Sequence, residues 1–516
     1  MNLLVLLLLS AAPVGGQVRE GTPDSVNLVK ARANGNTQQF EWLPWAPASF
    51  ARAKAENKFV LVDGAAEWCH WCHVMDETTY RDAEVGQWLS KNAIAIRVDI
   101  DERPDLAERY GEWGWPATIL LSSDAHELGK FRGYLPTEKL LEILHGLDAT
   151  SPMEAAAEPP GIPLAGVPAA MKQAIARLDF FWDEQEGGWG MRRKVPIGMN
   201  VLWELARGTK ASVARADFTL GKQRALIDPV AGGIYQYSAA EDWNDPHFEK
   251  LISFQTPNLE ASARGFLSTR KQPHLDDARA IYRYLTTTLR SPDGDFYVNQ
   301  DADVNAHDRS KPFVDGHVYY ALDAAGRAAV GAPWVDTHVY AADNGRAISA
   351  LLAFFEASGE GLEEARKTAD RLALTHVLAD GSVKREATSS AKGPFFLDDA
   401  ACLGLAYARL GKLTKDPKYA ALSRLITARM LTSFSDARAP MFDATLDADA
   451  VGVFARRRHS FAPNVNAARL LAAAGERDRG RMLIAALSGK DRLDGEWSWV
   501  GDYLLAAKEL GFEPAR

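Results

Sequence analysis

The residues most suited to chemistry in this chain are two cysteines that lie three positions apart, Cys69 and Cys72. Two thiols at this spacing can share a disulfide and exchange it with another molecule. If a helix begins at the first cysteine, its free N–H groups and its dipole stabilise a thiolate there, and the second sulfur lies one turn away. Histidines and tryptophans flank the pair and complete a candidate catalytic site: Trp68, His70, Trp71 and His73.

The segments around the two cysteines predict the strand and the helix that this chemistry needs. Residues 58–63 are rich in β-branched and aromatic side chains and predict a strand, and the residues after Cys72 predict a helix. Further strands and helices are expected over 93–99, 105–110, 119–121, 131–134 and 137–147. This order resembles a complete α/β thioredoxin-like domain, to which we assign residues 17–149.

The resemblance to thioredoxin extends to Pro116, which precedes the predicted strand beside the two cysteines. A proline at that place is cis in thioredoxin folds and leaves backbone groups free for an extended substrate peptide. Only about 5–6% of X-Pro bonds in folded proteins are cis, so the cis geometry is implied by the resemblance and not by the dipeptide. We include Pro116 among the candidate catalytic residues.

Length, charge and the first residues restrict the class of protein. A chain of 516 residues is too long for one ordinary core, and its net charge of -9 does not suit nucleic-acid binding. The apolar run over 3–9 is followed by small residues, which predicts a signal peptide over 1–16 and an exported protein without a membrane span in its mature chain. An uncleaved anchor is the alternative.

The second part of the chain predicts a different architecture. A linker rich in proline, alanine and glutamate over 150–166 precedes a region, 167–516, in which helical patterns dominate. Glycine–aromatic loops recur there at irregular spacing, which does not suit a strict solenoid. Helix pairs that cannot bury both faces alone stack around a ring, so we predict an all-α (α/α)6 toroid of six hairpins, with an open α-solenoid as the alternative.

Several longer motifs carry a resemblance to a known family. They are WCHWCHVM from Trp68, VDIDERPDLAERY from Val98, GWP from Gly114, GGWG from Gly187, DPVAGGIYQYS from Asp228, DWNDPHFEK from Asp242, QDAD from Gln300 and FLDDAA from Phe396. On these motifs the chain resembles the thioredoxin-domain family of spermatogenesis-associated protein 20 and its bacterial relatives (domain of unknown function 255), as a divergent member. The resemblance implies a thioredoxin-like domain fused to a toroid akin to glycosidases and sugar epimerases.

The predicted toroid supplies a second set of candidate residues, for substrate binding. Paired carboxylates beside a pocket suit hydrolysis of sugar bonds, and a histidine could transfer protons in an epimerase. The same acids could instead cap helices, turn the chain or form buried salt bridges, and the aromatics could simply pack in loops. The candidates are Trp189, Tyr235, His247, Glu249, Asp301, Asp303, Asp398 and Asp399.

A metal site is an alternative use of the cysteine motif. Cys69, Cys72 and His73 would share one helix face and could give three ligands to zinc or copper. A closed site needs a fourth ligand, and no second Cys/His cluster follows in the sequence. We therefore expect neither a metal nor another cofactor, with an open metal site, or one completed by a borrowed ligand, as the alternative.

The sequence supports two main hypotheses for function. The first is an exported thiol–disulfide oxidoreductase that exchanges electrons with a protein thiol or disulfide, while the toroid recognises that partner. The second is a carbohydrate-active or carbohydrate-binding toroid with an accessory thioredoxin-like domain. A metal-binding scaffold without turnover is a third possibility, and a nucleic-acid partner is not expected.

Overall fold

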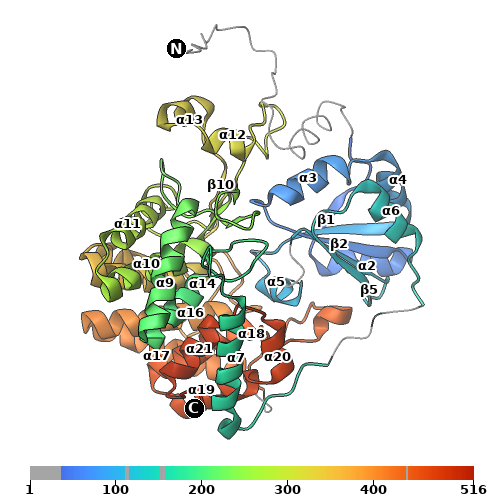
Figure 1. The fold of residues 1–516 in the computed structure, drawn as a ribbon. Helices are drawn as coiled ribbons and strands as arrows, with labels where there is room; N and C mark the ends of the chain where they lie inside the picture. Colours follow the sequence, from blue (N-terminus) through green and yellow to red (C-terminus); the bar gives the residue numbers. More distant parts are fainter. Residues whose placement is uncertain (1–36, 111–114, 151–152, 154–156, 437–439, 516) are drawn as a thin grey trace, which may run out of the picture.

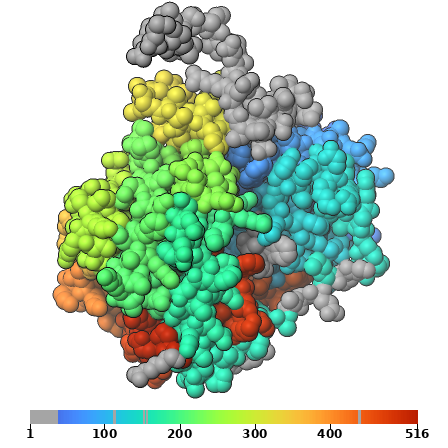
Figure 2. Space-filling model, in the orientation of Figure 1, coloured from blue at the N-terminus to red at the C-terminus, as the bar shows by residue number. Residues whose placement is uncertain are grey.

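The computed structural model describes residues 37–110, 115–150, 153, 157–436 and 440–515. The predicted signal peptide, Gly114 and part of the predicted linker lie outside these residues. None of the helices in the described ranges is long and apolar enough to cross a membrane. An α/β domain lies against a larger helical domain, and the two are in contact in the space-filling view (Figures 1 and 2).

The α/β domain is built on a five-stranded sheet with the strand order β1-β3-β2-β4-β5. The strands β1 and β2 run parallel to β3, and β4 is antiparallel to both β2 and β5. This arrangement confirms the predicted thioredoxin-like fold. The elements are β1 Trp42–Pro44, α2 Pro47–Glu56, β2 Phe59–Ala65, α3 His70–Thr78, α4 Ala83–Asn92, β3 Ala93–Asp99, α5 Pro104–Tyr110, β4 Ala117–Leu121, β5 Glu127–Arg132 and α6 Thr137–His145.

The central strand β2 is buried and carries the chain directly to the cysteine motif. Val62 pairs with Ile96 on one side and with Ile119 on the other, and its side chain is buried in the core. The last strand, β5, lies earlier than the 131–134 predicted for it. It is an edge strand whose residues are mostly half-buried and include Glu127 and Lys130, so the sequence lacks the apolar alternation that marks a strand.

The helical domain is a closed ring. Six inner helices contact one another in the order α8, α10, α14, α16, α18 and α21, and α21 returns to contact α8, which excludes the open solenoid. The inner helices are α8 Gly198–Arg207, α10 Ile252–Thr269, α14 Ala341–Ser358, α16 Leu397–Thr414, α18 Phe461–Ala474 and α21 Gly501–Glu509. Each packs on one outer helix: α9 Lys210–Gln223, α11 Gln272–Thr287, α15 Leu362–Thr375, α17 Pro417–Ser433, α19 Arg477–Leu487 and α7 Val167–Phe181. The predicted six-hairpin toroid is therefore confirmed.

Short elements connect the helices of the ring, and Figure 1 shows β10 between the ring and the segment that carries α12 and α13. Three two-residue strands pair in the order β10-β9-β8, and β6 pairs with β7. The strand β9 ends at Gln300, so this small sheet fixes the start of the segment that follows it. These elements are β6 Tyr237–Ser238, β7 Pro246–His247, β8 Lys250–Leu251, β9 Asn299–Gln300, α12 Gly316–Tyr320, α13 Ala324–Val330 and β10 Val335–Asp336, and α20 Lys490–Gly495 lies later in the chain.

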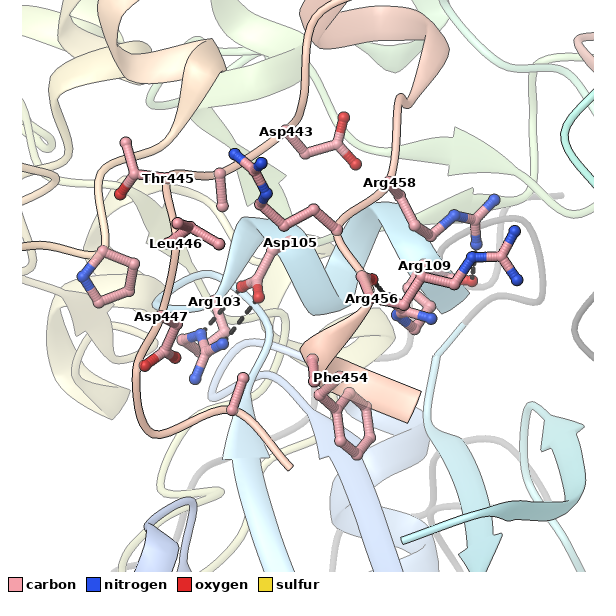
Figure 3. A pocket seen from close by; sticks show the side chains of 15 residues that line it. Arg103, Asp105, Arg109, Asp443, Thr445, Leu446, Asp447, Phe454, Arg456 and Arg458 are labelled. Atoms are coloured by element: carbon pink, nitrogen blue, oxygen red, sulfur yellow. Dashed lines mark hydrogen bonds and ion pairs between the residues drawn. The ribbon is translucent and has the colours of Figure 1, made fainter. Parts of the chain in front are cut away.

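Two of the regions in which the domains contact each other are an apolar cluster and a small pocket. In the first, an apolar cluster places Trp68, both cysteines and Ile100 against Leu251. In the second, α5 packs against residues 443–458 of the helical domain around a small pocket (Figure 3). There Arg109 Nη2 donates to the carbonyl of Arg456 at 2.6 Å, and Arg458 Nη1 donates to the carbonyl of Arg109 at 3.3 Å.

The close approach of α14 and α16 in the inner ring gives a test of the fold. A Cβ added at Gly345 would lie 2.6 Å from the backbone carbonyl carbon of Cys402, so the helices would have to separate. We expect Gly345→Ala to lower the free energy of unfolding by about 1–3 kcal/mol, measured by denaturant or thermal unfolding.

Gly221→Ala is the matched control. Gly221 lies in α9, and a Cβ there would meet no atom within 4 Å. That substitution should leave stability unchanged or raise it by up to about 1 kcal/mol, because alanine favours the helix. Equal effects of the two substitutions would contradict the packing described for the ring.

Candidate active site

Cys69 and Cys72 lie where β2 passes into α3, and they form a disulfide with a Cα–Cα distance of 5.2 Å. Cys69 is the N-cap of α3, and its Sγ accepts the backbone N–H of Cys72 at 3.2 Å. The sulfur of Cys69 thus sits at the positive end of the helix dipole. Reduction of the bond would leave a thiolate there in a favourable field.

The disulfide lies in the wall of a cleft between the two domains, with a volume of about 790 Å³. Cys69 lines this cleft, although it is only 4% exposed and Cys72 only 8%. This low exposure arises because the helical domain covers one side of the motif. The cleft is lined by Trp68, His70, Trp71, Trp115, Arg132, Gly133 and Tyr134 from one domain and by Arg193, Gln236, Tyr237, His247 and Glu249 from the other.

The Trp115–Pro116 peptide bond is cis, which confirms the geometry implied by the resemblance to thioredoxin. Pro116 itself is buried, and its carbonyl accepts the N–H of Gly133 at 2.7 Å. Its neighbour Trp115 lines the same cleft as Cys69. The proline loop and the disulfide therefore border one space, as a site for an extended peptide requires.

Two aspartates of the helical domain meet the two histidines of the cysteine motif. His70 Nδ1 lies 2.7 Å from Asp303 Oδ2, and His73 Nε2 lies 3.2 Å from Asp301 Oδ2. Both carboxylates are almost completely buried, and Asp303 Oδ1 also accepts the N–H of Gly316 at 2.7 Å. Two sets of residues that the sequence presents as separate candidates thus form one site.

The contact with Asp303 determines the charge of His70. Burial alone would lower the pKa of His70, but the carboxylate of Asp303 outweighs it and, with Glu249 and Asp315 nearby, raises this pKa to about 9. His70 is therefore an imidazolium at neutral pH. Because it directly follows Cys69, its charge favours the thiolate form of that cysteine.

Glu249 is a buried acid on the opposite wall of the cleft. Burial raises its pKa to about 7, although the charge of His70 acts in the opposite direction. Its Oε2 makes no hydrogen bond within the described residues and lies 4.0 Å from His247 Nδ1. His247 stacks on Tyr237, and burial together with the nearby charge of His70 lowers its pKa to about 4. Glu249 can therefore exchange a proton near neutral pH, and His247 stays neutral.

The two tryptophans of the motif are held in different ways. Trp68 Nε1 donates to Asp101 Oδ2 at 2.7 Å, and Asn299 of the helical domain donates to the same oxygen at 2.9 Å. Trp71 lies beside Tyr134, with ring centroids 5.8 Å apart, and borders the cleft. Trp68 thus fixes the loop before Cys69, and Trp71 forms part of the cleft wall.

The remaining candidates lie away from the cleft. Trp189 and Tyr235 are buried in apolar clusters and line none of the described cavities, which favours the alternative that these aromatics pack in loops. Asp398 pairs with Arg346 and accepts a hydrogen bond from Asn466 at 2.8 Å, inside the ring.

Asp399 has a positioning role. It accepts the N–H of Ala342 at the start of α14 and pairs with Arg385, which donates to the carbonyl of Asp101 at 2.6 Å. Asp399 therefore supports the loop that holds Trp68, and it does not cap its own helix.

Sequence reasoning missed three residues that complete this site. Asp101 and Asn299 hold Trp68, and His307 lies between Asp301 and Glu67, at 3.1 Å from each carboxylate. Asp101 lies within the motif that begins at Val98, and Asn299 directly precedes the motif that begins at Gln300. Their positions in these motifs could have marked both residues as candidates. His307 follows Asp301 by six positions and carries no comparable signal in the sequence.

Comparisons with known proteins agree with this organisation. Residues 28–149 match the family described as "Protein of unknown function, DUF255". Spermatogenesis-associated protein 20 from Mus musculus is 27% identical over 317 residues, which are 53% of this chain and 40% of that relative. These matches support a relationship of this chain to that family, as a divergent relative.

Two further similarities each cover a different part of the chain. A thioredoxin from Staphylococcus aureus (strain MW2) is 29% identical over 92 residues, which are 18% of this chain and 85% of the thioredoxin. The solved structure of cellobiose 2-epimerase from Bacillus thermoamylovorans B4167 is similar with a TM-score of 0.47 and 12% identity, over 64% of this chain and 86% of the epimerase. This chain therefore matches only about two fifths of the length of spermatogenesis-associated protein 20 from mouse, 40% of that relative.

The charge of His70 gives a direct test of the contact between the domains. Asp303→Asn removes the carboxylate but leaves the burial, so we expect the pKa of His70 to fall from about 9 to 6.5 or below. NMR titration of protein labelled at histidine measures this change. Asp336→Asn is the control, because Asp336 raises the pKa of His338 in the same way but contacts neither cysteine-motif histidine. A titration of His70 that is the same in both variants would contradict the proposed pairing.

The same contact predicts how stability depends on pH. The pKa of His70 is higher in the folded chain than its ordinary value of 6.5, so its stabilisation is complete below about pH 6.5 and is lost as the pH rises through about 9. The difference in free energy of unfolding between the original chain and Asp303→Asn should therefore shrink between those pH values. Chemical denaturation across this range measures it, and a difference that grows with pH would contradict the assignment.

Proposed function

We propose that this chain is a thiol–disulfide oxidoreductase whose Cys69–Cys72 pair reacts in the cleft between its two domains. The observation that carries the proposal is the position of Cys69, which caps α3, directly precedes the charged His70 and lines the cleft. A helix N-terminus and an adjacent cation both stabilise a thiolate, and the thiolate is the reacting form of cysteine. The local similarity to thioredoxin supports the same reaction.

The reaction is an exchange of one disulfide for another. In the reducing direction, the Cys69 thiolate attacks a substrate disulfide, forms a mixed disulfide and releases one substrate thiolate, which takes up a proton. Cys72 then loses its proton and attacks Cys69, which restores the Cys69–Cys72 disulfide and releases the second substrate thiol. The oxidising direction is the reverse, so the pair gains the two electrons that the substrate loses.

The walls of the cleft limit which substrates can reach Cys69. Arg193, Tyr237 and Glu249 of the helical domain face the side of the cleft formed by the cysteine motif and Trp115. We infer that the substrate is an extended peptide segment or a small thiol compound and not a folded protein surface. The helical domain then acts in substrate selection, and the predicted export would place the reaction outside the cytoplasm.

Trapping of the mixed disulfide tests the proposed order of attack. In Cys72→Ser the second step is blocked, so a disulfide between Cys69 and the substrate should accumulate and be visible on a non-reducing gel. Cys69→Ser should trap none, and Cys402→Ser is the control, because Cys402 is buried in α16 and should leave the adduct unchanged. If Cys72→Ser yields no adduct in the presence of a disulfide substrate, the proposal is wrong.

Glu249 is the group we propose to exchange protons with the reacting thiols. Its pKa of about 7 lies near neutral pH, and it lines the cleft beside Cys69 and His70, with His247, Asp301 and Asp303 also nearby. We expect Glu249→Gln to slow exchange about 10-fold or more and to remove the ionisation near pH 7 from the rate profile. Stopped-flow kinetics with a disulfide substrate measures both effects. A profile unchanged by the substitution would exclude this role.

The carbohydrate hypothesis has weaker support. Arg346 and Asn466, the partners of Asp398, line a cavity of about 200 Å³ inside the ring, whereas ligand pockets usually have volumes of about 300–1,000 Å³. A glycan-binding screen distinguishes the two functions. Sugar binding that is lost in Asp398→Asn and kept in Cys69→Ser would favour the carbohydrate function over the redox function.

A further inference from the structure

Three side chains from the two domains converge on one point beside the cysteine motif. Asp301 Oδ2 lies 3.2 Å from His73 Nε2 and 3.1 Å from His307 Nε2, and the three candidate ligand atoms all lie within 4.8 Å of one another. Asp301 is completely buried, and the two imidazole rings meet almost at right angles. Two histidines and a carboxylate in this arrangement are a set of ligands that transition metals prefer.

The contact between His73 and Asp301 differs from an ordinary hydrogen bond. His73 Nε2 is buried and lies close to Asp301, yet it meets the geometry of no hydrogen bond within the described chain. In a tetrahedral site with bonds of about 2.0–2.1 Å, donor atoms lie roughly 3.3 Å apart. The separations from Asp301 Oδ2 to the two histidine nitrogens, 3.2 and 3.1 Å, are close to this value.

The surrounding groups orient these side chains as metal sites require. His307 Nδ1 lies 3.1 Å from the carboxylate of Glu67, so the opposite nitrogen, Nε2, is the one directed at Asp301. The second oxygen of Asp301 accepts the N–H of Asp303 at 3.1 Å. Metal-binding histidines commonly contact a carboxylate through their other nitrogen, and metal-binding carboxylates are commonly held by hydrogen bonds.

We propose that His73, Asp301 and His307 bind a divalent transition metal ion of the zinc class, with Glu67 as an outer partner. The side chain of His307 is 26% exposed, so water can complete the coordination. This ligand set differs from the combination of Cys69, Cys72 and His73 considered from the sequence, since both sulfurs are joined in the disulfide. The bound ion would link α3 to the segment after β9 and so fix the cysteine motif against the helical domain.

Zinc binding by the oxidised full-length chain tests the proposal, because the disulfide keeps the cysteines from acting as ligands. After treatment with a chelator and its removal, calorimetric titration with zinc should show one ion per chain, confirmed by elemental analysis. Glu67→Gln should weaken binding about 10–100-fold, and His307→Gln and Asp301→Asn should weaken it further. His338→Gln is the matched control, because His338 also pairs with a buried aspartate but lies outside the cluster.

Cobalt gives a second measurement on the unsubstituted chain, which does not depend on whether the variants fold. Cobalt bound by histidine and carboxylate should give weak visible bands without the strong near-ultraviolet band of cobalt–thiolate bonds. Absence of zinc binding, equal binding by all variants, or a thiolate band in the reduced chain with no binding in the oxidised chain would each overturn the proposal. In the first case the three side chains form only an ion-pair network.

Discussion

The buried contact between His70 and Asp303 is the interaction on which the candidate active site depends. A histidine as buried as His70 would ordinarily be neutral, and the carboxylate of Asp303 makes the largest contribution to keeping it charged near neutral pH. That carboxylate belongs to the helical domain, whereas the sulfur beside the histidine belongs to the thioredoxin-like domain. The electrostatic field at Cys69 therefore arises from the assembly of both domains, and neither domain alone reproduces it.

The same assembly explains why the motifs of the helical domain gather at one end of the ring. Asp301 and Asp303 contact the histidines, Asn299 supports Trp68 through Asp101, and Asp399 acts through Arg385 on the same loop. Each of these residues positions the cysteine motif, and the end of the ring where they lie is covered by the α/β domain. The helical domain thus forms the second wall of the cleft, and Asp301, Asp303 and Asp399 hold the cysteine motif or its neighbouring loop in place.

Local patterns in the sequence predicted individual strands and helices well where the pattern within one element is sufficient to identify it. The strand over 93–99 and the helix start at the cysteine motif follow from side-chain periodicity and from the chemistry of a dithiol. The helix α10 is harder to predict, because Pro257 lies within it and polar residues such as Gln255 and Asn258 are buried in it.

The candidate site was predictable in its parts and not in its assembly. Asp303, the hydrogen-bond partner of His70, is 233 positions away along the chain. No local pattern in the sequence indicates which end of the ring meets the α/β domain. The burial of Trp189 could not be predicted either. A glycine–aromatic loop has the same sequence pattern whether its aromatic ring lines a cleft or packs in a core. Contacts between domains depend on the shape of both surfaces, which only the three-dimensional structure supplies.

The central claim is that the Cys69–Cys72 pair exchanges electrons and that the helical domain tunes it through Asp303. The reduction potential of the full chain, obtained by equilibration with glutathione buffers, tests this claim most directly. A thiolate stabilised by His70 favours the reduced form, so the potential should be less negative than about −270 mV, the value of thioredoxin, and should become more negative in Asp303→Asn. A disulfide that stays oxidised in every buffer, or a potential unaffected by Asp303→Asn, would contradict the account.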